Sequence, residues 1–545
     1  MTRRTGILAL AVTFTLGCGM ADSTGGPTED AATDLAYDAE QEDVAPPGDA
    51  IDYTDGRDDA LVCVECDPVA GCNDGLLCTG VDSCDWDEME GMFCCRHAPP
   101  VCPDEGACLV GECSEEQGGC IMVPLDVDGD GHSPVSCGHD DCDDSDYSVH
   151  PGARERCDDL DNDCDGAIDE DAWVPDGDVL VLSDPGEEPY STSLAVNDAS
   201  WAVAWLSDDG TGPVIRTGTI VPDPAGPIAS ITTITTTPSA PEQVLVVESG
   251  AGFVVAWTQQ RYDANSIVGV FMNADGTIPG GQVVVLDVGA SVLDVTAAEQ
   301  KATGRIGFFL RSDLNRDYEL YYLGVDWPPT SPAWGDHLRR LTWAAGFSGR
   351  PSAVGISTGF AVAWEDDRDG NTEIYFATMN GSGVLDGPAR RITSAPGDSQ
   401  NVSLAASPSG YGLAWMDSRA GGYDMLFSCL NVSGARTCPE LSITSGPEKS
   451  WYPALAYDGH GDQYAIAYAG LEEGLFHVGL TAVAPSSVPP PDDIDPGLEL
   501  DREETLIFAP AMGETLTSRG VMWVESDGGS TSAALFQQLE CEVEE

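Results

Sequence analysis

The chain has 545 residues, of which 93 are Asp or Glu and 23 are Lys or Arg, so its formal net charge is -70 at pH 7. Proteins that bind nucleic acids present a basic surface to the phosphate backbone, and this charge balance excludes that class of partner. Hydrophobic residues make up 42% of the chain, which is enough for sizeable cores in several domains.

The N-terminal segment has the features of an export signal. Two early arginines precede an apolar run, residues 7–16, and a glycine and Cys18 follow it. This run is too short to span a membrane, and the order of charge, apolar run and small residues indicates secretion. The segment resembles a bacterial lipoprotein signal, which implies that residues 1–18 form the signal peptide and that Cys18 carries lipid. A conventional secretory signal is the alternative, because Thr15 stands where an aliphatic residue is usual.

Residues 19–60 are rich in Asp, Glu, Gly, Ala, Pro and Thr and have almost no aromatic side chains. Such a segment cannot bury enough apolar surface to fold, so we expect a disordered acidic tether. Gly19, rather than Asp, follows the predicted lipidation site, which resembles lipoproteins of the bacterial outer membrane. The expected location is therefore the outer membrane or cell surface, with the N-terminal lipid as the membrane anchor.

Residues 61–120 hold a run of cysteines, from Cys63 to Cys120, with few apolar residues between them. In an exported chain this composition predicts a small module that is held together by disulfides. Zinc binding is the alternative, because Cys63 and Cys66 have metal-ligand spacing, but no second pair of this kind follows at finger spacing.

Residues 121–172 carry the densest acidic pattern, in which DVDGDG and DNDCDG each place carboxylates at alternate positions before a glycine. Carboxylates at positions one, three and five of a tight loop can converge on one hard cation, and glycine permits the positive φ of the turn. Neither loop is an EF-hand, because position twelve lacks a bidentate Glu, so other carboxylates must complete the site. The predicted metal-ligating residues are Asp126, Asp128, Asp130, Asp140, Asp141, Asp143, Asp144, Asp146, Asp161, Asp163, Asp165, Asp169 and Glu170.

Four cysteines, Cys137, Cys142, Cys157 and Cys164, lie among these carboxylates. Because disulfides form and persist in exported proteins, we expect the four to pair among themselves. Two such disulfides would hold the acidic loops in place before a cation binds.

The motifs D-x-D-G-D-G, D-C-D-D, V-x-P-G-A-x-E-x-C-D and D-N-D-C-D-G-x-I-D-E span about residues 126–171. They resemble the metal-binding repeat of MopE-type copper-binding proteins, which also occurs in exported proteins of myxobacteria and their relatives. The family name implies copper, whereas clustered carboxylates favour calcium and copper favours imidazole or thioether ligands. His132, His139 and His150 keep copper as an alternative, and a solvated acidic surface without metal is another.

From residue 173 to residue 545 the chain consists of strand-like segments rich in Val, Ile, Thr, Tyr and Trp, with Gly, Asp and Pro at the turns. Segments of about fifty residues resemble one another, which is typical of a repeat architecture. The clearest copies begin at Arg350 and Asn401, and each holds four expected strands. We therefore expect a mainly β fold with a C-terminal β-propeller. Seven blades are favoured, six are possible, and a series of β-sandwich domains is the alternative.

The last copy, from Leu506, stops after three strands, whereas residues 178–186 look like a fourth strand without the other three. We therefore expect one blade to be shared between the two ends of the propeller. Cys429 and Cys438 are close enough in sequence to pair, and the parity of the remaining cysteines pairs Cys541 with the cysteine-rich module.

The chain contains no nucleophile-elbow and no zinc-protease motif, and its Ser-Asp turns lack the spacing of sialidase turns. We therefore predict no catalytic residue and a protein that is not an enzyme. The predicted function is that of an exported cell-surface lipoprotein with a calcium-binding acidic module and a propeller for ligand binding or adhesion. The expected ligand is an unknown protein or glycan. A secreted glycan or peptide hydrolase that uses the propeller face, and a copper-binding surface protein, are the alternatives.

Overall fold

The computed structural model describes residue 78 and residues 81–87, 92–98, 101–156, 160–164 and 173–541, except 198–199, 211, 223–227, 235–240, 251, 261–264, 334–336, 445–448, 459–462, 473–474, 484–497, 504–505, 515–517 and 527–531. The predicted signal peptide, the lipidation site Cys18 and the acidic tether lie outside this part of the chain. Among the described residues, no helix has the length and apolar character needed to cross a bilayer.

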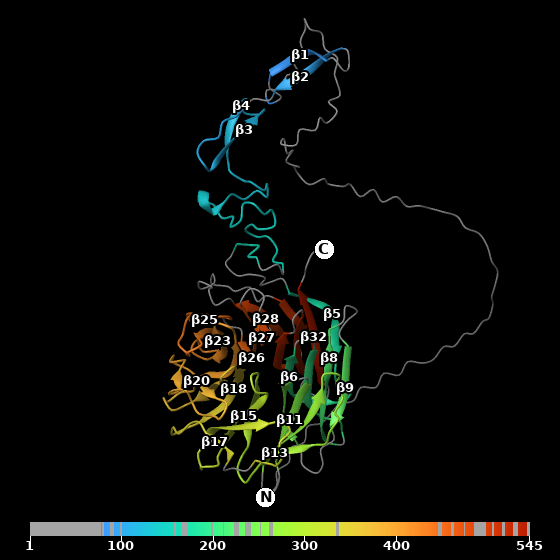
Figure 1. Cartoon of the computed structure of the whole chain (residues 1–545), viewed down its shortest axis with the longest axis vertical. Coiled ribbons are helices and arrows are strands. Elements are labelled where there is room, and N and C mark those ends of the chain that lie inside the picture. The colour runs from blue at the N-terminus through green and yellow to red at the C-terminus, as the bar shows by residue number, and fades with distance from the viewer. Residues whose placement is uncertain are drawn as a thin grey trace, which may run out of the picture. The chain divides into compact units, whose positions relative to one another are not determined.

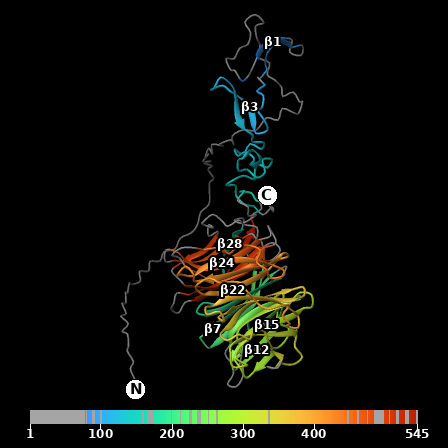
Figure 2. The ribbon, with the colours of Figure 1, turned by 90° about the vertical axis from the view of Figure 1, so that its left-hand side faces the viewer.

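Seven four-stranded antiparallel sheets make up the C-terminal region, which confirms the seven-bladed propeller (Figures 1 and 2). Blades 1 to 3 comprise β6 (Glu188–Asn197), β7 (Ser200–Asp208), β8 (Pro213–Val221) and β9 (Ile228–Ile234); β10 (Pro241–Ser249), β11 (Gly252–Gln260), β12 (Asn265–Asn273) and β13 (Val283–Val288); and β14 (Leu293–Gln300), β15 (Arg305–Ser312), β16 (Glu319–Asp326) and β17 (Arg339–Arg340). Blades 4 to 6 comprise β18 (Ser348–Ile356), β19 (Gly359–Asp366), β20 (Glu373–Asn380) and β21 (Arg390–Arg391); β22 (Ser399–Ala406), β23 (Gly410–Asp417), β24 (Asp424–Asn431) and β25 (Leu441–Ser442); and β26 (Lys449–Asp458), β27 (Gln463–Glu472), β28 (Leu475–Val483) and β29 (Leu498–Glu503). Blade 7 comprises β30 (Leu506–Glu514), β31 (Ser518–Ser526), β32 (Ser532–Cys541) and β5 (Trp173–Val181).

Blade 7 takes its outer strand from the start of the propeller, as the sequence predicts. The strand β5 pairs antiparallel with β32, with Val181 opposite Leu535 and Trp173 opposite Cys541. The first strand of each blade contacts the first strands of both neighbouring blades, and β30 contacts β6, so the ring is closed. These seven strands, here called the inner strands, are β6, β10, β14, β18, β22, β26 and β30.

Hydroxyl side chains join the inner strands of adjacent blades. The backbone N–H groups of Val246, Leu404 and Leu455 donate to serine hydroxyls on the preceding inner strand at 2.9, 3.1 and 3.0 Å. The strands also approach closely, because a Cβ at Gly355 would lie 1.7 Å from the carbonyl oxygen of Glu299. Only glycine fits at such a crossing, since any larger residue would separate blades 3 and 4.

The second strand of each blade is buried on both faces. The strands β7, β19 and β23 read SWAVAWLSD, GFAVAWED and GYGLAWMD, and nearly all their side chains are buried. A strand packed between two neighbouring blades gains from apolar residues on both faces, which explains the continuous apolar runs in place of alternation. The tryptophans that recur in these strands fill the space between blades, namely Trp205, Trp257, Trp364, Trp415 and Trp523.

A buried ion pair crosses from blade 6 to blade 7. The guanidinium of Arg519 lies 2.7 Å from the carboxylate of Asp458, and their side chains are 3% and 1% exposed. The same guanidinium lies 4.2 Å from the ring centroid of Trp173, the first residue of β5. One cation thus connects both parts of the shared blade to its neighbour.

We expect Asp458→Asn to lower the free energy of unfolding by about 3 kcal/mol, because it leaves a guanidinium buried without its counter-charge. The matched control is Asp326→Asn, whose carboxylate pairs with Arg305 but is 81% exposed; its effect should stay below about 1 kcal/mol. Urea unfolding followed by tryptophan fluorescence measures both. Equal losses for the two variants would show that the buried pair does not stabilise the ring.

Two short hairpins precede the propeller. They are formed by β1 (Val81–Asp87) with β2 (Met92–Ala98) and by β3 (Leu109–Ser114) with β4 (Gly119–Pro124), and a single 3₁₀ turn, η1, spans Val135–Cys137. Disulfides join Cys78 to Cys113 and Cys102 to Cys120. This region is therefore held by disulfides as predicted, whereas the zinc-spaced pair Cys63 and Cys66 lies outside the described residues.

The disulfide pairing of the acidic module differs from the prediction. Cys142 bonds to Cys164, but Cys137 bonds to Cys108, which precedes β3. The chain returns after β4, where the N–H of Leu125 donates to the carbonyl of Cys108 at 3.0 Å, and this return brings the two cysteines together. Counting cysteines cannot reveal such a return.

The other predicted disulfides lie in or near the propeller. The bond between Cys429 and Cys438 in blade 5 is present as predicted. Cys157 and the side chain of Cys541 lie outside what the structure describes, so the predicted pairing of the C-terminus with the cysteine-rich module stays a prediction.

Candidate metal centre

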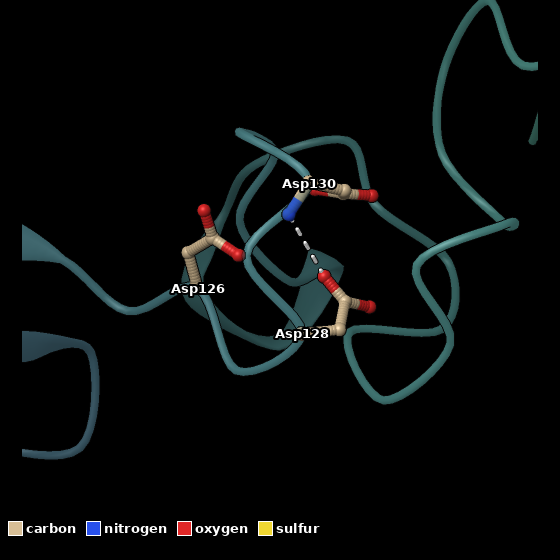
Figure 3. Close-up of side chains that lie close together, drawn as sticks. All are labelled: Asp126, Asp128 and Asp130. Carbon is tan, nitrogen blue, oxygen red and sulfur yellow. Dashed lines mark hydrogen bonds between the residues drawn. The ribbon is translucent and has the colours of Figure 1, made fainter. Parts of the chain in front are cut away.

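The first acidic loop, residues 126–131, is held in shape by hydrogen bonds to its own carboxylates. Figure 3 shows the three Asp residues and the bond between Asp130 and Asp128. Asp126 accepts from the N–H groups of Gly129 and Gly131 at 2.7 and 3.0 Å, and Asp128 accepts from Asp130 at 3.2 Å. Both glycines have positive φ, 85° and 97°, which a larger side chain would resist. One carboxylate oxygen from each of the three Asp residues lies within 4.8 Å of the others.

A fourth carboxylate reaches this loop from the next segment. Asp141 is 1% exposed and is held by backbone bonds, its N–H donating to Ser133 at 3.1 Å and its carbonyl accepting from Val135 at 2.8 Å. Asp144 accepts from the N–H of Val127, inside the loop, at 3.1 Å. The loop and the segment after η1 therefore form one carboxylate cluster, here called cluster 1, of Asp126, Asp128, Asp130, Asp141 and Asp144.

Three oxygens of cluster 1 are buried without a hydrogen-bond partner among the described residues. They are one oxygen each of Asp128, Asp130 and Asp141. Burial raises the pKa of Asp128, and the charges of Asp130 and Asp141 raise it further. Burial also raises the pKa of Asp141, with Asp130 and Asp144 adding to the effect. Buried carboxylates normally have partners, so these oxygens have the arrangement that a bound cation would satisfy.

A second group, here called cluster 2, consists of Glu155, Asp161 and Asp163, whose carboxylate oxygens lie within 4.8 Å of one another. Glu155 is 4% exposed, and it accepts from the N–H of Asp163 at 2.8 Å. Asn162 supports the turn from its interior, because its side-chain oxygen accepts from the N–H of Arg156 at 2.9 Å. The cluster is therefore built on a hydrogen-bonded loop that the Cys142–Cys164 disulfide closes.

The predicted ligands divide accordingly. Asp140, Asp143 and Asp146 join neither cluster: Asp140 faces His132 at 3.6 Å, and the other two accept from the N–H and hydroxyl of the serine two residues later. Hydrogen bonds from Ser148 lower the pKa of Asp146, as expected of a turn-forming carboxylate. Asp165, Asp169 and Glu170 lie outside the described residues.

Sequence reasoning missed Glu155 as a candidate ligand. The motif P-G-A-x-E-x-C could have identified Glu155, because it is one of the motifs that resemble the MopE repeat. Glu155 lies outside both Asp-rich hexapeptides, on which the ligand prediction was based. Only the folded loop brings it to Asp161 and Asp163.

The donor atoms of both clusters are carboxylate oxygens, which favour a hard cation. The imidazoles of His132 and His150 lie outside them, stacked on each other with ring centroids 4.9 Å apart. Nδ1 of His132 faces Asp140, and Nδ1 of His150 lies 3.3 Å from the carbonyl of Pro151. The described histidines therefore add no nitrogen ligand to either cluster.

Comparison with known proteins places a metal-binding motif in this region. Residues 141–170 match the family model of the copper-binding MopE repeat, described as "Putative metal-binding motif". The psiI protein of Dictyostelium discoideum is 39% identical over 69 residues, which are 12% of this chain and 10% of that protein. The chain thus spans only about a tenth of the length of this curated relative.

Solved structures match part of the chain at low identity and low TM-score. The hemagglutinin-neuraminidase ectodomain of parainfluenza virus 5 matches with 8% identity and a TM-score of 0.38, over 68% of this chain and 87% of that chain. The polysaccharide lyase Uly1 matches with 8% identity and a TM-score of 0.41, over 65% and 90%. A Trypanosoma rangeli sialidase matches with 10% identity and a TM-score of 0.35, over 58% and 60%.

The prediction that the protein is not an enzyme is corrected: solved structures that match the chain include a sialidase and a polysaccharide lyase, so the missing motifs give no ground for excluding catalysis. That prediction depends on the absence of short linear motifs, whereas a propeller can bring catalytic groups together from loops of separate blades. At these identities and TM-scores the likeness assigns no activity to this chain.

We expect Asp141→Asn to weaken divalent-cation binding about tenfold or more, because it removes a charge from the buried side of cluster 1 and keeps the side-chain volume. Asp140→Asn is the matched control, since the side chain of Asp140 is 69% exposed and points to His132. Isothermal titration of the purified chain with calcium as the probe ion compares the two. If both variants bind as the unaltered chain does, Asp141 is not a ligand.

Proposed function

We propose that this protein is an exported, lipid-anchored surface protein in which calcium stiffens the acidic module and the propeller binds the ligand. The observation that carries the proposal is the set of three buried carboxylate oxygens in cluster 1, on Asp128, Asp130 and Asp141, that lack a hydrogen-bond partner among the described residues. Like charges at this spacing destabilise the fold unless a cation lies between them.

Calcium fits the clusters better than copper. Calcium takes six to eight oxygen ligands in flexible geometry, and cluster 1 offers several carboxylates. Asp126, Asp128, Asp130 and Asp141 would hold the ion of cluster 1, and Glu155, Asp161 and Asp163 that of cluster 2. The bound cation would offset the carboxylate repulsion, so it would stabilise only the folded module.

Hydrogen exchange read by mass spectrometry tests this proposal on the full mature chain. With free calcium at about 100 times the dissociation constant, slow amides in peptides from residues 121–164 should exchange about 100-fold more slowly than in a chelator, since mass action adds about 2.7 kcal/mol. Copper added in place of calcium should not restore the protection.

The control is internal to the same sample. Peptides from blades 4 and 5, which lack these clusters, should exchange at the same rate with and without calcium. Unchanged exchange in residues 121–164 on chelation would overturn the metal proposal, and restoration by copper alone would overturn the choice of calcium.

The anchor is proposed from the lipoprotein-like segment that ends at Cys18. We expect the unaltered chain to partition with membranes and Cys18→Ser to move to the soluble exported fraction, because a lipid attached to the thiol would hold the chain at the bilayer. Cell fractionation with a carbonate wash, followed by mass spectrometry of the N-terminal peptide, measures this. A Cys18→Ser chain that stays with the membrane, or an N-terminal peptide without lipid, would refute the anchor.

A hydrolase that acts on a glycan or peptide is the second candidate. One observation favours it: Arg311, Asp294, Arg350 and Glu365, from blades 3 and 4, interact at the start of the inner strands. Groups of opposite charge at one end of the ring can orient a polar substrate. Incubating a candidate oligosaccharide with the protein and analysing it for cleavage distinguishes a hydrolase from a binding protein.

A further inference from the structure

Every inner strand contains a β-bulge close to its first residue. The strand register shifts between Pro189 and Ser191, Pro241 and Gln243, Leu293 and Thr296, Gly349 and Ser352, Gln400 and Ser403, Trp451 and Ala454, and Phe508 and Ala511. Neighbouring inner strands contact each other around the closed ring. The bulges therefore surround one end of the ring axis, and we call this set of positions the bulge ring.

Four consecutive bulges place a residue in the left-handed region of backbone conformation. These residues are Asp294, Arg350, Asn401 and Tyr452, with φ of 47°, 45°, 51° and 57°. None is glycine, although the left-handed region is unfavourable for most other residues. Bulges re-aim side chains and backbone strain concentrates at functional sites, so the repetition points to a role for these side chains.

Contacts between blades hold three of the four bulges in place. The N–H of Arg350 faces a carboxylate oxygen of Asp294 at 3.4 Å. One blade further on, the N–H of Asn401 donates to Glu365 at 2.7 Å. The next bulge continues the series, because the N–H of Tyr452 lies 3.4 Å from the sulfur of Met416. Each of these three bulges is thus positioned by a side chain of the preceding blade.

The charged groups at the bulges of blades 3 and 4 are paired, whereas Glu242 at the bulge of blade 2 is exposed. Arg311 lies 2.6 Å from Asp294, and Arg350 lies 3.3 Å from Glu365, whose side chain is 1% exposed. In a chain with a net charge of -70, these pairs form a patch in which donors and acceptors alternate with little excess charge. A strongly anionic or cationic ligand would find no unbalanced counter-charge in these pairs.

Aromatic side chains lie at other bulges of the ring and around Arg311. Tyr452 is 41% exposed, and Tyr190, at the corresponding bulge of blade 1, is 52% exposed. The guanidinium of Arg311 lies 5.0 Å from the ring centroids of both Tyr318 and Phe347. Amphipathic rings beside paired charges offer an apolar face and hydrogen-bonding edges together.

We propose that the bulge ring binds a neutral, hydroxyl-rich ligand, namely an uncharged oligosaccharide. Hydroxyl groups both donate and accept, so they match a patch of paired guanidinium and carboxylate groups. The apolar C–H faces of a sugar match the exposed tyrosine rings. The inference rests on the proposed function only in taking the propeller as the ligand-binding part of an exported protein.

The test uses two substitutions that keep the backbone. Asn tolerates left-handed φ, and the chain itself has Asn401 at this position in blade 5. Arg350→Asn removes the exposed guanidinium, and Tyr452→Asn removes the exposed ring. The matched control is Arg390→Asn on β21, the outermost strand of blade 4, where an exposed arginine is removed far from the inner strands.

Isothermal titration of the full mature chain with a panel of neutral hexasaccharides, namely glucans with β-1,3, β-1,4 and α-1,4 linkages and chitohexaose, measures binding. At least one should bind, and Arg350→Asn and Tyr452→Asn should each weaken that binding about tenfold or more, with Arg390→Asn unchanged. Oligogalacturonate, a charged probe of similar length, should bind at least about tenfold more weakly than the best neutral sugar. Melting temperatures of all variants show whether the ring has stayed folded.

Three results would overturn the proposal: no binding to the whole neutral panel, tighter binding to oligogalacturonate, or full binding by both bulge-ring variants. If one variant fails to fold, the other decides, because the two side chains come from different blades. Titrations in calcium and in chelator separate this test from that of the acidic module. Sugar binding without calcium-dependent protection would support the bulge-ring proposal and overturn the calcium proposal. Calcium-dependent protection without sugar binding would support the calcium proposal and overturn the bulge-ring proposal.

Discussion

The pairing of β5 with β32 is the interaction on which the propeller depends. Without it, blade 7 would end at β32 with an unpaired edge, and β30 would have no complete blade to hold beside β6. Its backbone bonds join residues that are more than 350 positions apart, such as Val181 and Leu535. The closed cycle of inner strands, and with it the bulge ring, follows from this one pairing.

Carboxylates are buried in two different ways in this chain. In the propeller, burial opposes ionisation of Asp366 and Asp417, but hydrogen bonds led by those from Arg368 and Arg419 outweigh it and lower their pKa values. In cluster 1, burial and neighbouring charges raise the pKa values of Asp128 and Asp141. These two propeller carboxylates thus have their counter-charges within the chain, whereas in our proposal a bound cation would supply the counter-charge of cluster 1.

The sequence predicts the propeller well because the blades repeat one local pattern, from an inner strand to an apolar second strand that contains Trp in five of the seven blades. The incomplete copy at Leu506 even predicts the shared blade. The acidic site is harder to predict from the sequence. Glu155 reaches Asp161 and Asp163 only because the chain folds back as a loop, and Cys137 bonds to Cys108 only because the chain turns back after β4. The bulge residues follow no linear motif, since their left-handed backbone depends on contacts from the preceding blade.

The disulfides of the acidic module also have a mechanical consequence. The bond from Cys108 to Cys137 closes a covalent loop that contains Asp126 to Asp130, and the bond from Cys142 to Cys164 closes another around Glu155 and Asp161. When the chain is pulled at its ends, the force passes from one cysteine to the other through the disulfide bond. The residues between the two cysteines of each disulfide therefore bear little of this force. A pull along the chain would therefore bypass Asp126 to Asp130 and cluster 2, whereas Asp141, which lies between Cys137 and Cys142, would bear it.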